Sequence, residues 1–208
     1  MKIGFQQVIR QVVCLALLAS IVASVNAQSI SAGERKHGFC ASCHGINGRS
    51  FKVNYPILAG QTAPYILRQL RDFKQGRRSE PNMNAVVPQL NDTDMQDLAA
   101  FFASLTPASS PSQSDPIKAR RGKKKAESAH CASCHLGQAN PTISETARIE
   151  GQHPNYVMKQ LHDFRAGRRA NDGGVMHQIA QGMTDADIED LGNYFASVRF
   201  DNPKRVQK

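Results

Sequence analysis

The sequence has 208 residues, of which 26 are lysine or arginine and 17 are aspartate or glutamate, so its formal net charge is +9. A basic chain can bind nucleic acid, but the N-terminus has the pattern of an export signal, which argues against that class of partner. An acidic partner protein or an anionic membrane surface fits the charge better, and the charge could also serve solubility alone.

Residues 1–27 are predicted to be a signal peptide. Lys2 and Arg10 form a short basic region, and residues 12–25 are apolar and small, with a suitable cleavage site after them. An uncleaved anchor is the alternative, although the apolar run is short for a membrane span. Cleavage would remove Cys14 and both basic residues. It would leave a net charge of +7 and place the mature chain in the periplasm.

The pentapeptide Cys-x-x-Cys-His occurs twice in the remaining chain. Cysteines at positions i and i+3 lie on one helical face and can form thioethers with two vinyl groups of one haem, and the adjacent histidine can then bind the iron. The motif residues are Cys40, Cys43 and His44 in the first copy and Cys131, Cys134 and His135 in the second. The sequence therefore predicts two covalent haem c groups, and no mature cysteine remains for a disulfide. Zinc at these motifs is the alternative, which the export signal and the flanking repeat oppose.

The chain repeats itself with a period of about ninety residues, which indicates two copies of one folding unit. Residues 65–78 match residues 156–169 closely, and apolar residues recur at helical spacing in both segments. Pro64 and Pro154 suit the first turns of these helices, and a glycine in each copy suits the end.

Two more helices are expected in each unit, and no strand pattern is evident. One helix leads into each Cys-x-x-Cys-His motif, at 32–43 and 122–134. The other begins near Asn91 in the first unit and near Thr184 in the second, where Thr184 and Asp187 resemble a capping box. The apolar stripes of these last helices are Met95, Leu98, Phe102 and Leu105 in the first unit, and Ile188, Leu191, Phe195 and Val198 in the second.

The Pro/Ser-rich segment 106–117 is predicted to be an extended linker, because it cannot hold a helix. It separates a first domain at 28–105 from a second at 118–202, which is followed by a tail at 203–208. Cores of this size are marginal, so each haem is expected to be structural as well as functional.

Met83 and Met176 are the candidate sixth ligands of the two irons. Each follows a Gly-Arg-Arg motif and precedes the last helix of its unit, at matched positions of the repeat. A thioether ligand raises the reduction potential and leaves no open site for a substrate. The alternatives are that both methionines are core residues, or that His177 replaces Met176 as the ligand.

With these residues in place, the chain resembles the cytochrome c4 family of periplasmic dihaem cytochromes over about residues 31–199. The resemblance rests on both haem motifs, the Gly-Gln pairs at 60–61 and 151–152, the repeated Tyr-x-x-x-Gln-Leu-x-Asp-Phe-x-x-Gly-Arg-Arg segment and the two methionines. It implies an all-α fold of two tandem class I cytochrome c domains, each wrapped round one covalent haem with His/Met ligation and packed face to face. It also implies electron carriage towards a terminal oxidase.

Two positions of the second unit depart from the family pattern. Pro56 of the first unit is expected to accept the Nδ1–H of the proximal histidine through its carbonyl, and its counterpart is Ala147. Ala147 also has a carbonyl, so the bond can survive in a less rigid loop. Glu150 stands where the first unit has Ala59.

The sequence favours an electron carrier of a periplasmic respiratory chain, not an enzyme, with acidic redox proteins as partners and loose membrane association compatible with the charge. The main alternative is the dihaem cytochrome subunit of a larger dehydrogenase, such as a flavocytochrome sulfide dehydrogenase. A dihaem peroxidase is opposed by the matched methionines.

The basic cluster at 118–125 is interpreted as either a docking patch or a solvated helix face. Arg77, Arg78, Arg168 and Arg169 could pair with haem propionates or lie on the surface.

Overall fold

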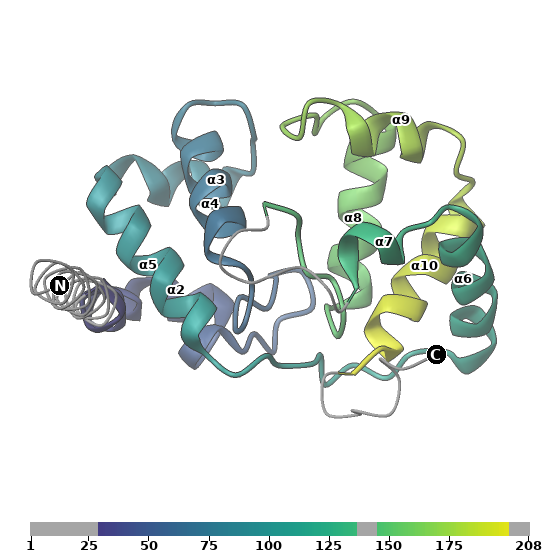
Figure 1. Ribbon diagram of the computed structural model, residues 1–208, viewed down its shortest axis with the longest axis horizontal. Helices are drawn as coiled ribbons and strands as arrows, with labels where there is room; N and C mark the ends of the chain where they lie inside the picture. The colour runs from purple at the N-terminus through teal and green to yellow at the C-terminus, as the bar shows by residue number, and fades with distance from the viewer. Residues whose placement is uncertain (1–28, 137–144, 200–208) are drawn as a thin grey trace, which may run out of the picture.

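The computed structural model describes residues 29–136 and 145–199, and every regular element within these ranges is helical. Figure 1 shows two groups of helices side by side, one from the first part of the chain (purple to teal) and one from the second (green to yellow). The all-α class is therefore confirmed. The predicted signal peptide and C-terminal tail lie outside the described residues. Among the described helices, none combines the length and the apolar character needed to cross a bilayer.

The first unit begins with a helical stretch at 29–36, which a turn at residue 37 separates from the next helix. Its further elements are α2 (Gly38–His44), η1 (Ile46–Gly48), α3 (Ala63–Lys74), α4 (Pro81–Val86), η2 (Val87–Gln89) and α5 (Asp92–Ser104). The second unit contains α6 (Pro116–Ser128), α7 (Ala132–His135), α8 (Pro154–Arg165), α9 (Val175–Gln181) and α10 (Asp185–Ser197). The helix expected before each motif is thus broken in two, because a turn precedes α2 and α7.

Local sequence defines the ends of the main helices. Proline occupies the first turn of α3 and of α8, and the glycines that follow them, Gly76 and Gly167, have φ angles of 73° and 70°. Glycine adopts such angles without a Cβ clash, so it ends a helix at little cost. α5 and α10 each begin with a capping box, and the one predicted for Thr184 and Asp187 is confirmed.

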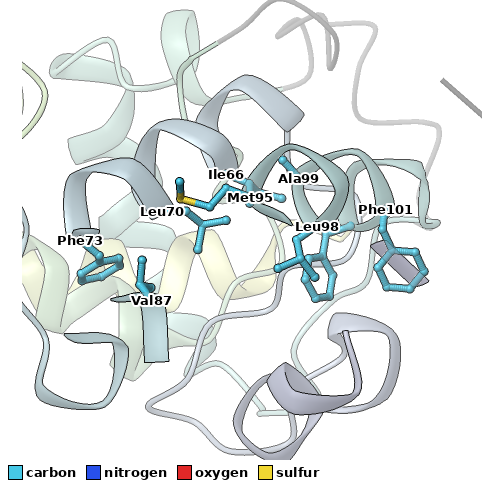
Figure 2. Packing of buried hydrophobic residues seen from close by; sticks show 9 residues of the cluster. Ile66, Leu70, Phe73, Val87, Met95, Leu98, Ala99 and Phe101 are labelled. Atoms are coloured by element: carbon cyan, nitrogen blue, oxygen red, sulfur yellow. The ribbon is translucent and has the colours of Figure 1, made fainter. Parts of the chain in front are cut away.

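The core of each unit forms mainly between two helices. These are α3 and α5 in the first unit and α8 and α10 in the second. Figure 2 shows Ile66, Leu70 and Met95 meeting between α3 and α5. The corresponding residues of the second unit, with α8 packed on α10, include Val157, Leu161, Phe164, Ile188, Leu191 and Phe195. Both sets are buried, which confirms the predicted stripes except at Leu105 and Val198, which are only half-buried. Each full burial of such a side chain contributes about 1.5–3 kcal/mol.

A glycine lets the first helix of each unit cross the last one at close range. An ideal Cβ built on Gly33 would lie 2.1 Å from the carbonyl oxygen of Asp97 in α5. One built on Gly122 in α6 would lie 2.0 Å from the carbonyl oxygen of Asp190 in α10. No real side chain fits at that distance, so both crossings require glycine.

Two candidate cofactor sites

The first candidate site is built around α2. Cys40 is half-buried and packs against the core of its unit, and His44 is buried, with 7% of its surface exposed. The Nδ1–H of His44 donates to the carbonyl oxygen of Pro56 over 2.9 Å, as the sequence predicted. With Nδ1 protonated, the neutral ring keeps its lone pair on Nε2, the atom that would bind a metal. Burial lowers the pKa of His44 by more than this hydrogen bond raises it, which favours that neutral form.

The second candidate site repeats this geometry around α7. Cys131 packs against the second core, and the Nδ1–H of His135 donates to the carbonyl oxygen of Ala147 over 2.7 Å. The bond expected to survive the loss of proline is therefore present, because it uses the backbone carbonyl, which alanine also has. Burial lowers the pKa of His135, whereas its bond to Ala147 and the negative charge of Glu150 act in the opposite direction.

Met83 and Met176 lie on α4 and α9, two short helices that the sequence did not reveal as helices. Both are half-buried, and each packs against the same core cluster as the first cysteine of its own unit. The structure therefore places Cys40 and Met83 against one core, and Cys131 and Met176 against the other.

The rival ligand His177 is engaged elsewhere. Its Nδ1 lies 2.6 Å from the carbonyl oxygen of Phe164, and its Nε2 lies 2.8 Å from Nε2 of Gln181. Because both ring nitrogens already have hydrogen-bond partners, ligation by His177 would require breaking one of these contacts. Met176 is the better candidate on this ground.

The four repeat arginines divide into two exposed and two buried ones. Arg77 pairs with Asp72 and Arg168 with Asp163, so these two are used within their own units. Arg78 and Arg169 are only 9% and 7% exposed, and neither has a carboxylate within ion-pairing distance among the described residues.

The buried arginines instead form a reciprocal network across the two units. Arg78 donates to Gln69 of its own unit and to Tyr156 and Gln160 of the other. Its repeat counterpart Arg169 donates to Gln160 of its own unit and to Tyr65 and Gln69 of the other. Each guanidinium also lies over a phenylalanine ring, at 4.6 Å and 4.5 Å. The two sites are thus linked through one shared polar layer.

This network has a surplus of buried positive charge. Burial alone would raise the pKa of Tyr65, but the charges of Arg169 and Arg78 outweigh it and the pKa is lowered. A buried cation is costly without a counter-charge, and guanidinium pairs well with carboxylates. The layer is therefore chemically suited to anionic groups such as the two propionates that a haem carries, so the residues present fit that cofactor.

Two glutamines clasp the units together with the same reciprocity. The amide of Gln61 donates to the carbonyl oxygen of Arg148 and accepts from its N–H, over 2.8 Å and 2.9 Å. The amide of Gln152 makes the same pair of bonds with Ile57, over 3.0 Å and 2.9 Å. Gln61 and Gln152 are the glutamines of the repeated Gly-Gln pairs, so the interface has approximate two-fold symmetry.

His153 breaks this symmetry, because its counterpart in the first unit is Thr62. It is fully buried, with Nδ1 lying 2.7 Å from the hydroxyl of Ser110 in the linker. Its Nε2–H donates to the carbonyl oxygen of Ser50 in the first unit over 3.0 Å. One histidine therefore joins both units and the segment between them. Sequence reasoning missed it, since a single histidine outside any motif gives no signal.

Half of the basic residues in the cluster at 118–125 pair α6 with α10. Lys118, Arg121 and Lys125 pair with Glu189, Asp190 and Asp187 of α10, and Lys123 pairs with Glu127 of its own helix. Arg120 and Lys124 are exposed. The arrangement favours the interpretation of the cluster as a helix face over that of a free docking patch.

The comparisons with known proteins agree with this architecture. The cytochrome c family model matches residues 31–106 and 119–199, which correspond to the two helical units. A cytochrome c4 of Pseudomonas aeruginosa is 38% identical over 174 residues, which cover 79% of this chain and 86% of that protein. A Stutzerimonas stutzeri protein named thiosulfate dehydrogenase electron acceptor is 32% identical over 169 residues, which cover 76% of this chain and 78% of that protein. The solved structure of reduced recombinant cytochrome c4 from Pseudomonas stutzeri is similar with a TM-score of 0.75 and 33% identity, over 82% of this chain and 98% of that one.

Proposed function

This chain belongs to the cytochrome c4 family, and we propose that it carries electrons in a periplasmic respiratory chain through two haems, each ligated by one histidine and one methionine. Membership makes it an electron-transfer protein with two covalent haem c groups, not an enzyme, and gives it two tandem class I cytochrome c domains. We propose in addition its periplasmic compartment, its respiratory role and the residues that bind each haem.

The proposed attachment sites are Cys40 and Cys43 for the first haem and Cys131 and Cys134 for the second. The proposed iron ligands are His44 with Met83, and His135 with Met176. The observation that carries the assignment is the matched pair of proximal histidines, each buried and oriented by a backbone carbonyl so that Nε2 is available. Haem supplies one-electron chemistry, and these residues hold it and set its potential.

Arg78 and Arg169 are proposed to neutralise the inner propionates of the two haems. Their burial without a carboxylate partner among the described residues supports this role, and so does their position in the layer shared by both units. A cation held beside each propionate would also raise the potential of the haem that carries it, because positive charge favours the reduced state.

The proposed domain limits are 28–105 and 118–202, joined by the linker 106–117. The family matches at 31–106 and 119–199 support these limits, as does the break between α5 and α6. The last two residues of the proposed linker, Pro116 and Ile117, belong to α6, where Asp115 caps the helix. Residues 1–27 are proposed to be the export signal, which would deliver the chain to the periplasm where covalent haem attachment takes place.

Mass spectrometry and an anaerobic redox titration test the assignment. We expect the mature chain to carry the mass of two haems that resist acid–acetone extraction, and the spectra to show iron–thioether absorption for both. One haem per chain, or a high-spin ferric signal in the untreated protein, would contradict the His/Met proposal.

A second proposal concerns the donor, because one relative is named an electron acceptor of thiosulfate dehydrogenase. The chain could accept electrons directly from a dehydrogenase, in line with the dehydrogenase-linked alternative predicted from the sequence. Reduction of the purified chain by such an enzyme and its substrate, at rates that saturate with the concentration of the chain, would support this role. Reduction only through added mediators would exclude it.

A further inference from the structure

The first unit has a group of exposed apolar side chains around its haem motif. Phe39, Ile46, Phe51 and Val53 are 61%, 75%, 79% and 37% exposed, and all lie close in sequence to His44. Large apolar side chains gathered in one exposed region mark an interaction surface more often than scattered ones do.

Hydrogen bonds join the loop that carries Phe51 to α2. Nζ of Lys52 donates to the carbonyl oxygen of Ser42 over 2.9 Å, and the hydroxyl of Ser42 donates to the carbonyl oxygen of Phe39 over 3.2 Å. The hydroxyl of Ser50 donates to the carbonyl oxygen of Cys43 over 3.3 Å. The loop that carries Phe51 and Lys52 therefore lies directly against the helix that carries the motif.

The charge around this region is of one sign. Residues 35–71 contain six lysines and arginines and no acidic residue, whereas the matched residues 126–162 contain two basic and three acidic ones. Three of the other four basic residues are paired: Lys36 with Asp94 and Asp97, Arg71 with Asp92, and Arg68 with Glu145. The fourth, Arg35, is exposed. Arg49 and Lys52, which flank Phe51, are exposed and face no carboxylate among the described residues.

The repeat gives an internal comparison. At the positions matched to Phe39, Ile46, Phe51 and Val53, the second unit has His130, Gly137, Thr142 and Ser144. At these four positions the second unit has no large apolar residue, and its matched segment has fewer basic residues, although the two copies share their framework residues. The second unit has exposed apolar side chains elsewhere, at Ile117, Val175 and Ile179. A requirement of haem binding alone would affect both copies alike.

We propose that Phe39, Ile46, Arg49, Phe51, Lys52 and Val53, here called the first-unit face, form the docking surface for a redox protein with acidic residues around an apolar contact area. The proposal rests on the proposed electron-carrier function and adds that electrons exchange with this partner through the first unit. An apolar centre rimmed by charge is the anatomy of a protein interface, and unpaired cations at the rim would steer an acidic partner.

The experiment compares two charge-reversal pairs of equal size. Arg49→Glu with Lys52→Glu alters the first-unit face, and Arg120→Glu with Lys124→Glu alters exposed residues of α6 as the control. The probe is plastocyanin, a copper protein with an acidic surface patch, and the measurement is the second-order electron-transfer rate at several salt concentrations. We expect the first pair to lower the low-salt rate about tenfold and flatten its salt dependence, and the control to change it less than twofold.

A third variant tests the apolar part. Phe51→Ser should lower the rate at all salt concentrations without changing its salt dependence, because it removes contact area and leaves the charge. Equal losses for both charge-reversal pairs would mean that only net charge matters and would overturn the proposal. A larger loss for the control pair would move the docking surface to the second unit, which also overturns it.

Vesicles distinguish a membrane surface from a protein partner. If Arg49→Glu with Lys52→Glu abolishes binding to phosphatidylglycerol vesicles but leaves the rate with plastocyanin unchanged, the face binds membranes and the proposal is wrong. Haem content and both potentials are measured for every variant. A wild-type chain without two His/Met haems defeats the proposed function, whereas intact haems with unaffected rates defeat only the docking surface.

Discussion

At the scale of single residues, the two sites share their orienting bonds but differ in charge and in one buried histidine. Backbone carbonyls of Pro56 and Ala147 orient the proximal rings equally well, so the bond does not depend on proline. Glu150 and His153 have no chemical equivalent in the first unit, where Ala59 and Thr62 stand. Differences between the haems should therefore trace to these positions.

Replacing either Met83 or Met176 by alanine should remove half of the iron–thioether absorption and lower the potential of one haem, because the thioether favours ferrous iron. Visible spectra during a redox titration measure both effects. His177→Ala is the matched control and should leave the absorption intact, since both ring nitrogens are engaged in other contacts. A spectrum altered by His177→Ala and not by Met176→Ala would reverse the assignment.

Glu150→Gln should raise the potential of the second haem and leave that of the first unchanged. The negative charge of Glu150 favours positive charge at His135, since it acts to raise the pKa of that ring. A negative charge also stabilises ferric iron, which carries more positive charge than ferrous iron. Removing the charge of Glu150 should therefore make reduction of the second haem easier. Potentiometry resolves the two haems, and a fall in the second potential would contradict this reasoning.

Stability should decline as pH falls below about 6.5, partly through His153. Burial lowers the pKa of this ring below its ordinary value of 6.5, so the unfolded chain binds the proton more readily than the folded one. The contribution is complete above the unfolded pKa and is lost as pH falls towards the folded pKa. Denaturation of wild type and His153→Thr between pH 5 and 7.5 should give a smaller pH dependence in the variant. An unchanged slope would assign the effect to other groups.

The proposed ligands have local signals in the sequence, whereas their surroundings do not. The Cys-x-x-Cys-His motif favours haem attachment, and the repeat aligns the two methionines. The cross-unit partners of Arg78 and Arg169 could not be predicted, because contacts between units leave no local periodicity. The recurrence of Tyr65 as Tyr156, and of Gln69 as Gln160, is the one signal that the sequence contains for this layer, and it does not reveal which residues meet.

At the scale of elements, helices were predictable where caps and apolar spacing coincide. α5 and α10 have capping boxes, and α3 and α8 have a proline in the first turn and a glycine after the last, each together with apolar residues at helical spacing. α4 and α9 are six and seven residues long, too short to show a period, and the left-handed Gly174 that starts α9 is visible only in the backbone.

Gly122→Ala should destabilise the second unit by about 1–3 kcal/mol or more, although alanine normally favours a helix over glycine. The new methyl group would overlap the carbonyl oxygen of Asp190 and push α6 away from α10. Gly38→Ala in α2 is the matched control, because nothing lies within 4 Å of its Cβ position. Chemical denaturation measures both, and equal stabilities for the two variants would show that the crossing can relax.

At the scale of the whole molecule, the packing of the units on each other is held by polar rather than apolar contacts. The glutamine clasps, the arginine layer and His153 provide most of the described bonds between them. Sequence analysis obtained face-to-face packing only from the family resemblance, since a polar interface has no hydrophobic pattern.

Gln152→Ala should loosen the interface without unfolding either unit. It removes two hydrogen bonds and leaves the backbone groups of Ile57 unpaired, at a cost of about 1–3 kcal/mol. Small-angle scattering should report a larger radius of gyration, and calorimetry should separate the melting of the two units. Gln75→Ala, at an exposed helix end, serves as the control. A single unchanged transition would show that the remaining contacts suffice.

The two-fold symmetry of the interface also has an evolutionary consequence. Reciprocal clasps such as those of Gln61 and Gln152 are the contacts that two identical subunits make across a dyad, so the chain has the form of a homodimer fused by its linker. In a true homodimer every substitution appears on both sides at once. Fusion removes that constraint, because a substitution in one half no longer appears in the other. One half can therefore have a residue such as His153 or Glu150, or the first-unit face, while the other half keeps a different residue. The differences between the halves can therefore specialise each of them for a separate step of electron transfer.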